Sequence, residues 1–433
     1  MASIVRQSKY RHVFGEELKV RFEEAKSSAL ASEGTLVVTN GKYVAFCWNS
    51  SGPGILSVLN TKNETGRINP AHPWIRGHGG NITDFEFNPF NENEIVTGCE
   101  DAQIRLWRIH NDHLTEDLIA PLTTLSGHSK KVSLLNFHPS AAYILASTSH
   151  DKTLKIWNVE RSEVALSYDG LTDIATSLQW SPHGKQIGFS TRDKIVKGLD
   201  PRSNSLSFEF RPHDGGKPSK LTWMDEHTLV TCGFSAGADR QISVWDLRHN
   251  QTSLKHINLD QGSGVLYPFY DADTTCLFVG GKGDGTVRFY EVTRDHEFMY
   301  YLGAFQSNIP CKGISFAPKH TVDTNVCEIM RAVKLTNNSV DVISFRVPRK
   351  SEMFQDDIYP ECVANIPAMR AEEWLGGENK DPVRVDIRNV GSANLSVEIK
   401  AVKTPAEYEH ELKVAHEEIE RLKRRVHELE SRG

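Results

Sequence analysis

The chain has 433 residues, of which 39 % are hydrophobic and 24 % charged, and its formal net charge is −6. These values are typical of a globular protein with a sizeable core, and the acidic net charge argues against a general nucleic-acid binder. The sequence has no uncharged apolar run near the roughly 18 residues that a membrane span needs, and its seven Cys form no CxxC pair. We therefore expect a cytosolic protein without a signal peptide, membrane insertion, a zinc site or a disulfide framework.

A short motif recurs along the first three quarters of the chain, from an Asp through alternating apolar residues to a closing aromatic or apolar residue. The closing residues are Trp107, Trp157, Leu199, Trp245 and Phe289, with weaker matches near Leu59 and Val333. Their separations of 42 to 50 residues are typical of WD-repeat blades, each a four-stranded antiparallel sheet. Seven marks predict an all-β fold, a seven-bladed β-propeller of the WD40 type over residues 1–347. The N-terminal segment is expected to close the ring by pairing with the last blade.

Two blades also carry a Gly-His pair thirty residues before the closing Trp. In each we expect one hydrogen-bonded network, made by His78, Thr97, Asp101 and Trp107 and by His128, Ser147, Asp151 and Trp157. A buried His, hydroxyl and Asp resemble a catalytic triad, but their recurrence in successive blades favours a structural role, since a buried Asp needs partners.

Motifs typical of enzymes are missing from the sequence. GKGDG at residues 281–285 lacks the spacing of a phosphate-binding loop, and neither HExxH nor a nucleophile elbow occurs. We therefore predict a non-enzymatic protein without catalytic, cofactor-binding or metal-binding residues.

The pattern changes after the repeats. Pro348, Pro360 and Pro367 favour an extended, non-helical path for residues 348–375. Residues 376–404 are rich in Gly and polar side chains and are predicted to be a linker, in which VRVDIRNV and LSVEIKAV alternate enough to form a short hairpin.

Residues 405–433 are predicted to form a short α-helical coiled coil, because apolar residues recur there in alternating steps of three and four. Leu412, Ile419 and Val426 fall at a positions, and Tyr408, Ala415, Leu422 and Leu429 at d positions. β-branched residues at a with Leu at d favour a dimer, whereas RVHELE at residues 425–430 has the Arg-to-Glu pattern of trimeric coiled coils. We favour a trimeric homo-oligomer, with dimer and tetramer as alternatives. The residues expected to carry the association are Leu412, Ile419, Leu422, Arg425, Val426, Leu429 and Glu430.

Four longer strings resemble the coronin family of actin-filament-binding propellers: SKYRHVFG at 8–15, PFYDAD at 268–273, GKGDGTVRFYE at 281–291 and FRVPRKSEMFQDDIYP at 345–360. The similarity extends from about residue 3 to residue 374 and returns in the last 25 residues. The resemblance implies that residues 347–375 pack under the propeller. It also implies a protein of the cytoplasm and cortical actin cytoskeleton that binds and crosslinks or bundles filaments and acts with the actin-related nucleation complex and cofilin. The alternative is a generic WD-repeat scaffold, such as a ubiquitin ligase adaptor.

Because actin filaments are acidic, the resemblance also implies a basic contact surface. Lys26 follows the run Phe22-Glu23-Glu24-Ala25, where the family typically has Arg, so the charge is kept but the bidentate fork is lost. An ordinary solvated charge remains an equally good interpretation of each basic residue alone. The actin-binding candidates are Arg6, Lys9, Arg11, Lys26, Lys130, Lys131, Lys194 and Arg202.

Overall fold

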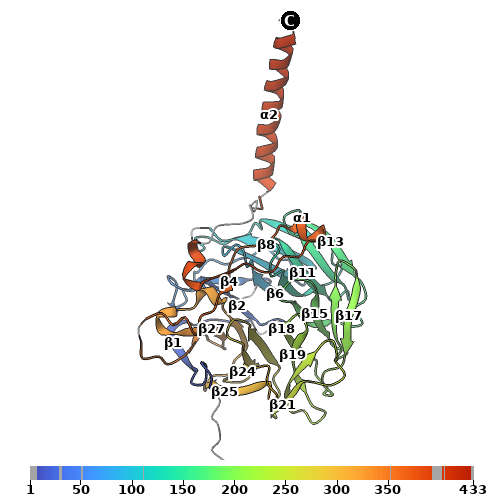
Figure 1. Ribbon diagram of the computed structural model, residues 1–433. Helices are drawn as coiled ribbons and strands as arrows, with labels where there is room; N and C mark the ends of the chain where they lie inside the picture. Colours follow the sequence, from blue (N-terminus) through green and yellow to red (C-terminus); the bar gives the residue numbers. More distant parts are fainter. Residues whose placement is uncertain are drawn as a thin grey trace, which may run out of the picture.

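The computed structural model describes residues 7–28, 32–49, 52–110, 112–351, 353–392, 402–403 and 405–430. Within these ranges, seven antiparallel sheets stand in a ring around a central opening as the blades of a propeller (Figure 1). The seven-bladed β-propeller expected from the repeat is confirmed.

The strands of each blade are given from the central opening outward. Blades 1 to 3 contain β2 (Val37–Thr39), β3 (Tyr43–Cys47) and β4 (Leu56–Asn60); β6 (Ile82–Phe87), β7 (Glu94–Cys99), β8 (Gln103–Arg108) and β9 (Thr123–Ser126); β10 (Val132–Phe137), β11 (Ile144–Ser149), β12 (Leu154–Asn158) and β13 (Glu163–Tyr168). Blades 4 to 6 contain β14 (Ala175–Trp180), β15 (Ile187–Thr191), β16 (Val196–Asp200) and β17 (Ser205–Phe210); β18 (Lys220–Asp225), β19 (Thr228–Phe234), β20 (Arg240–Asp246) and β21 (Lys255–Asp260); β22 (Leu266–Asp271), β23 (Cys276–Gly281), β24 (Thr286–Val292) and β25 (Met299–Gln306).

Blade 7 is built from both ends of the propeller sequence. Its first three strands come from the last repeat, and the outer strand β1 comes from the N-terminal segment; the strands are β26 (Gly313–Phe316), β27 (Glu328–Leu335), β28 (Ser339–Arg346) and β1 (Phe14–Glu23), with the short β5 (Gly66–Arg67) alongside β1. β1 pairs with β28 antiparallel along its length, and Phe22 at its far end is fully buried. The ring therefore closes through the N-terminal segment, as the repeat predicts.

The weak repeat mark near Val333 was assigned to the wrong strand. Val333 lies on β27, the second strand of blade 7, whereas the other marks lie on third strands. The 3₁₀ turns η1 (Lys319–Thr321) and η2 (Thr324–Val326) lengthen the connection before β27. This insertion shifts the spacing in blade 7 without changing the number of blades.

Polar side chains on the innermost strands join neighbouring blades. Each accepts a hydrogen bond from a backbone N–H on the innermost strand of the next blade, and we call these the interblade bonds. They join Asp84 to Leu135 (2.8 Å), Glu86 to Phe137 (2.7 Å), Asn136 to Trp180 (2.9 Å), Ser177 to Leu221 (3.2 Å) and Gln179 to Trp223 (3.3 Å). Burial raises the pKa of Asp84 to about 7 and that of Glu86 to about 8, against the effect of the amides that they accept from. Blades 2 to 5 are therefore linked by side chains as well as by apolar packing.

The two faces of the ring differ. We call the face that carries the loops entering the innermost strands the upper face, and the face that carries the loops between first and second strands the lower face. These names do not refer to the orientation of the molecule in Figure 1. Residues 348–351 and 353–392 lie across the lower face, where Tyr359 donates to the carbonyl of Glu328 (2.8 Å) and the carbonyl of Met369 accepts from the N–H of Ala142 (3.0 Å). Helix α1 (Ala371–Leu375) buries Trp374 against Trp180, with ring centroids 5.4 Å apart.

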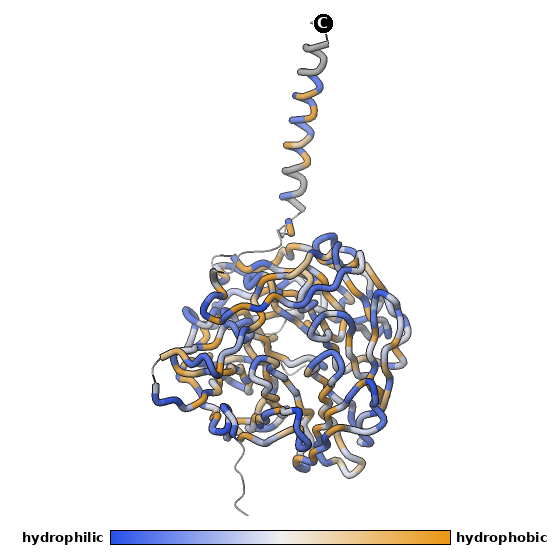
Figure 2. Tube along the Cα trace, viewed as in Figure 1, coloured by the Kyte–Doolittle hydropathy of each residue, from blue (hydrophilic) through white to orange (hydrophobic). Residues whose placement is uncertain are grey.

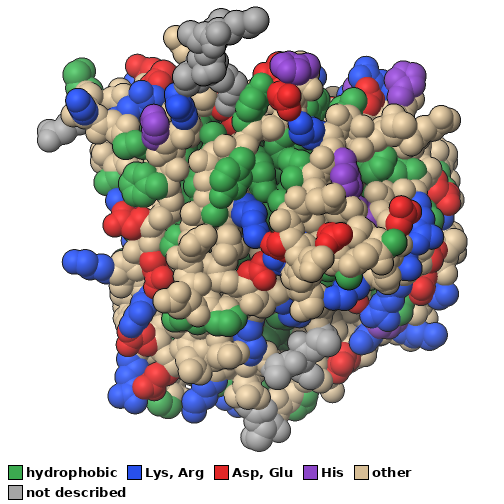
Figure 3. Space-filling view, turned by 90° about the horizontal axis from the view of Figure 1, so that it is seen from below, with side chains coloured by type: hydrophobic (Ala, Val, Ile, Leu, Met, Phe, Trp, Pro, Cys, Tyr) green, Lys and Arg blue, Asp and Glu red, His purple; other side chains and the backbone are tan. Residues whose placement is uncertain are grey.

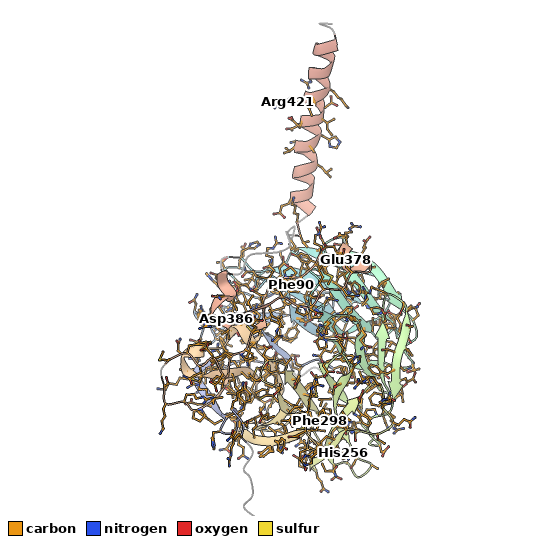
Figure 4. All side chains as sticks on the ribbon, viewed as in Figure 1. Phe90, His256, Phe298, Glu378, Asp386 and Arg421 are labelled. Atoms are coloured by element: carbon orange, nitrogen blue, oxygen red, sulfur yellow. The ribbon has the colours of Figure 1, made fainter. Side chains whose placement is uncertain are left out.

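Residues 376–392 are not the free linker that the sequence predicts. β30 (Arg384–Val385) pairs with β29 (Cys362–Val363), and η3 (Ile387–Ser392) follows at once; Glu378 and Asp386 mark this segment in Figure 4. In the first half of the predicted hairpin the strand is limited to Arg384–Val385, because η3 follows it; the carboxylate of Asp386 accepts from the N–H of Arg388 (2.9 Å) at this turn. The second half of the predicted hairpin lies outside the described residues as far as residue 401.

The chain returns to the lower face immediately before the C-terminal helix. Val402 is buried among apolar side chains of blades 2 and 3, and its carbonyl accepts from Nη2 of Arg108 (2.8 Å). Helix α2 (Pro405–Glu430) then extends away from the ring, with apolar and polar residues alternating along it (Figure 2). Among the described residues, no helix has the length and apolar composition that a membrane span requires.

Candidate functional site

The blade 3 network has the arrangement of a triad but lies inside the blade. Trp157 donates from Nε1 to the Ser147 hydroxyl (2.7 Å), which lies 2.7 Å from Nε2 of His128. Nδ1 of His128 lies 3.0 Å from Asp151. Burial lowers the pKa of His128, although Asp151 opposes the shift, so the ring is neutral at pH 7 and links hydroxyl to carboxylate.

In blade 2 the four predicted residues lie together, and Arg105 joins them. The Thr97 hydroxyl lies 2.5 Å from Nε2 of His78 and accepts from Trp107 (2.8 Å), as in blade 3. Arg105 contacts both Nδ1 of His78 and, at 2.7 Å, Asp101. Burial and the charge of Arg105 lower the pKa of His78 to about 4.

His78, Cys99 and Asp101 have donor atoms within 4.8 Å of one another, a spacing that a metal ion could bridge. The residues around them do not fit one. Arg105 already places a positive charge between His78 and Asp101, and burial raises the pKa of the Cys99 thiol to about 12, so it is not a thiolate. We assign this cluster to the structural network of blade 2.

A third network lies in blade 5, and sequence reasoning missed it. Nε2 of His213 lies 2.9 Å from the Thr231 hydroxyl, which accepts from Trp245 (2.9 Å). Nδ1 of His213 lies 3.2 Å from Oε1 of Gln241, while the motif residue Asp239 accepts from the Ser235 hydroxyl instead. Pro212 in place of Gly before the His, and a separation of 32 residues from His213 to Trp245 instead of 29, hid the motif, although Asp239 keeps its place six residues before the Trp. The signal that the sequence offered was the repeat motif DRQISVW, which ends at Trp245.

In the described part of the chain, the residues of these networks do not line the central cavity, whose volume is about 1150 Å³. Their hydroxyls and His rings are buried, so a substrate would have no access to them. The arrangement can hold the loop and the sheet of a blade together, and the same role recurs in blades 2, 3 and 5.

The predicted basic residues lie on two opposite faces. Lys26, Lys130, Lys131 and Lys194 lie in loops of the upper face, and within the described ranges none of their ammonium groups forms an ion pair. Lys130 and Lys131 precede blade 3, and Lys194 follows β15 in blade 4. Lys26 and Lys130 are exposed and Lys131 and Lys194 half-buried, and cations without carboxylate partners in the described ranges make this face suited to an acidic partner.

Upper-face cations of blades 3 and 4 act electrostatically on the same histidine. Burial first, and then the charges of Lys131 and Arg192, lower the pKa of His150 in the intervening loop. We call Lys130, Lys131, His150, Arg192 and Lys194 the blade 3–4 basic cluster. The rim, in contrast, carries Lys, Arg, Asp and Glu side chains interspersed (Figure 3).

A second upper-face group surrounds Lys26. The side chain of Lys26 is exposed, while its carbonyl accepts from the N–H of Asn49 (2.6 Å), which fixes the backbone beside blade 1. The neighbouring Ser27 hydroxyl accepts from Lys312 (2.8 Å). Burial and the nearby charge of Lys282 lower the pKa of Lys312.

The other candidates do not belong to this surface. Lys9 and Arg11 lie at the lower-face end of β1, where Lys9 donates to the carbonyl of Asp357 (2.6 Å). Arg202 donates to the carbonyl of Glu378 (3.1 Å) and stacks on the Trp374 ring (5.1 Å). These contacts give Lys9 and Arg202 structural roles beneath the propeller, and Arg6 lies outside the described residues.

The seam residues of the C-terminal helix are described in part. Leu412, Ile419 and Leu422 are 59 %, 48 % and 52 % exposed on α2. The backbone is helical through residue 430, but the side chains of Arg425, Val426, Leu429 and Glu430 lie outside the description. The helix therefore presents an uncovered apolar seam along its described part.

Comparisons with known proteins agree along most of the chain. A WD-domain G-beta repeat model matches residues 71–108 and 119–158, another type of WD40 repeat matches 340–382, and a domain of unknown function matches 3–67. Coronin-A of Dictyostelium discoideum is 38 % identical over 435 residues, covering all of this chain and 97 % of that protein. Coronin-2A of Homo sapiens is 35 % identical over 393 residues, covering 88 % and 74 %.

Two further comparisons concern a longer relative and a solved structure. The coronin-like protein of Saccharomyces cerevisiae is 36 % identical over 423 residues, and the chain spans 94 % of its own length but 64 % of that relative. The crystal structure of the WD40 domain from Toxoplasma gondii coronin superposes with a TM-score of 0.83 at 34 % identity, covering 87 % of this chain and 97 % of the solved one.

Replacing Asp151 by Ala should destabilise the protein by about 1–3 kcal/mol at pH 7, because buried partners lose their acceptor. Burial would raise the pKa of Asp151, but bonds from Ser129, Thr153 and His128 outweigh it and lower the pKa to about 2. The carboxylate thus contributes stability above pH 4, and the contribution is lost as the pH falls from about 4 to 2. Urea unfolding should show the gap between wild type and variant narrowing below pH 4. Asp169→Ala, at an exposed site of the same blade, is the control; equal effects of the two changes would contradict the structural role.

Proposed function

Because the chain belongs to the coronin family, we propose that it is an actin-filament-binding regulator of the cytoskeleton, located in the cytoplasm and the cell cortex. The observation that carries the proposal is the 38 % identity to Coronin-A along the full chain, helix included. A binding role also fits a propeller whose polar networks are buried. WD propellers generally act as scaffolds that present surfaces to partners.

The upper face is the proposed filament-binding surface. Lys26, Lys130, Lys131 and Lys194 extend from its loops without carboxylate partners in the described part of the chain, whereas residues 348–351 and 353–392 cover the lower face. Charges at this exposure interact with an acidic filament in a salt-dependent manner, because the Debye length at physiological ionic strength is about 8 Å. The proposed affinity of a single propeller for the filament is therefore modest.

Crosslinking is proposed to depend on the C-terminal helix. Leu412, Ile419 and Leu422 remain exposed on α2, and association with further copies of the helix would cover them. A parallel trimer, with dimer and tetramer as alternatives, would hold several propellers on one coil. Each later contact with a filament would then be effectively intramolecular, which can strengthen apparent binding by about 10² to 10⁴.

The actin-related nucleation complex and cofilin are further proposed partners. They rest on the family resemblance alone, and we assign them no residues of this chain. The association with actin itself is the part of the proposal that the following experiments test.

Charge reversal separates the two faces. Lys130→Glu with Lys131→Glu should weaken cosedimentation with filamentous actin at least about tenfold, because two upper-face cations become acids facing an acidic filament. Arg11→Glu, on the lower face, should leave binding within about twofold of wild type. The opposite order of effects would place the filament on the lower face, and failure of the wild type to bind would refute the proposed function.

One matched pair of substitutions tests the helix. Ile419→Asp puts a charge in the predicted seam, whereas Val414→Asp makes a similar change at similar exposure (48 % and 51 %) outside it. Light scattering should show that the first variant is monomeric and the second oligomeric, since a buried charge opposes association. Of these two variants, only Val414→Asp should form actin bundles that sediment at low speed. A monomer that still bundles filaments would assign the bridging to the propeller.

A further inference from the structure

A short segment crosses the upper mouth of the central cavity. The Ser32 hydroxyl contacts the carbonyl of Thr83 in blade 2, and the carbonyl of Gly34 lies 3.4 Å from the Tyr267 hydroxyl in blade 6. Lys220 in blade 5 donates to the carbonyl of Glu33 (2.5 Å). Because these contacts come from three blades, the backbone of residues 32–34 is fixed over the middle of the ring.

The packing around Gly34 shows how closely the segment fits. A Cβ at this residue would lie 2.3 Å from Oδ1 of Asp84, which is nearer than such atoms approach. Lys220 is itself held from two sides, since it also donates to the carbonyl of Thr176 and lies 5.5 Å from the Tyr267 ring. The side chain of Glu33 is therefore presented from a fixed backbone.

Glu33 directs its carboxylate into the blade 3–4 basic cluster. Oε1 lies 2.8 Å from Nη2 of Arg192, and the Glu33 charge also acts on the buried part of this cluster, where it opposes the lowering of the His150 pKa. Lys130 and Lys131 act on the same His. One carboxylate thus lies among several cations that have no other acidic partner in the described ranges.

We propose that Arg192 and the lysines of the blade 3–4 basic cluster form a receptor for carboxylates of an acidic protein partner, and that Glu33 occupies this receptor until the partner displaces it. The proposal rests on the proposed function only for identifying the partner as the actin filament.

The energetics allow such a displacement. The Glu33 and Arg192 side chains are 27 % and 45 % exposed, and ion pairs with this exposure contribute little to stability. The bonds that fix the segment are made by its backbone and by Ser32, so release of the Glu33 carboxylate leaves them intact. A partner that offers several carboxylates would replace one weak pair by several.

Glu33→Gln tests the proposal, because it removes the competing charge and keeps the shape of the side chain. The matched control is Glu297→Gln, which removes the same charge from another 2.8 Å ion pair, with Lys255, in a loop that opens on the lower face. Both variants raise the net charge by one, so a general charge effect would appear in both. The probes are filamentous actin and, separately, fluorescent poly-L-glutamate, each bound to the full chain at two salt concentrations.

Glu33→Gln should bind both probes about two- to fivefold more tightly than wild type, and Glu297→Gln should match wild type. The gain should vanish in an Arg192→Gln background, which removes the receptor. Equal affinities of the two Gln variants for poly-L-glutamate, or no binding of that probe, would overturn the inference whatever actin does. Binding of poly-L-glutamate with the expected gain, but no binding of actin, would leave the receptor standing and refute the proposed function.

Discussion

The pairing of β1 with β28 is the constraint on which the rest of this structure depends. A blade cannot bury both of its faces alone, and a ring of blades removes open edges only when the last blade is completed. Here the completing strand comes from the N-terminus, so residues distant in sequence share one sheet. The closing strand also leads to residues 24–28 and 32–36 on the upper face, where Lys26 and Glu33 lie. Ring closure and construction of the proposed binding surface are therefore the same event.

Within the closed ring, polar groups are placed by burial. The interblade bonds align the innermost strands, and the His, hydroxyl and Trp networks tie each loop to its own sheet. These groups resemble catalytic machinery in composition, but each is saturated by its neighbours and shielded from solvent. The chemistry that remains for partners lies in exposed loops, where cations lack carboxylates and where one carboxylate, on Glu33, lies among them.

Local patterns in the sequence were sufficient to predict the blades, whereas the structure was needed to show which residues share a face of the ring. The spacing from His128 to Trp157 predicted a network, because all four residues lie within one hairpin unit. Arg11 and Lys26 are close in sequence, yet a strand of ten residues, about 33 Å long, separates them and puts them on opposite faces. Residues 376–392 appeared to be a linker because their anchoring contacts, such as that of Arg202, come from distant blades. The longer separation from His213 to Trp245, 32 residues instead of 29, concealed the blade 5 network.

Hydrogen exchange in β28 tests the central claim most directly, since β28 is an internal strand only while β1 closes the ring. Phe22→Ala removes a fully buried side chain from β1, and Phe14→Ala removes one that is 43 % exposed on the same strand. A core Phe→Ala change costs about 3–5 kcal/mol. The account predicts that Phe22→Ala speeds exchange in both β1 and residues 339–346, and that Phe14→Ala leaves both close to wild type. Unchanged protection of residues 339–346 in Phe22→Ala would show that blade 7 is complete without the N-terminal strand, and would contradict the account.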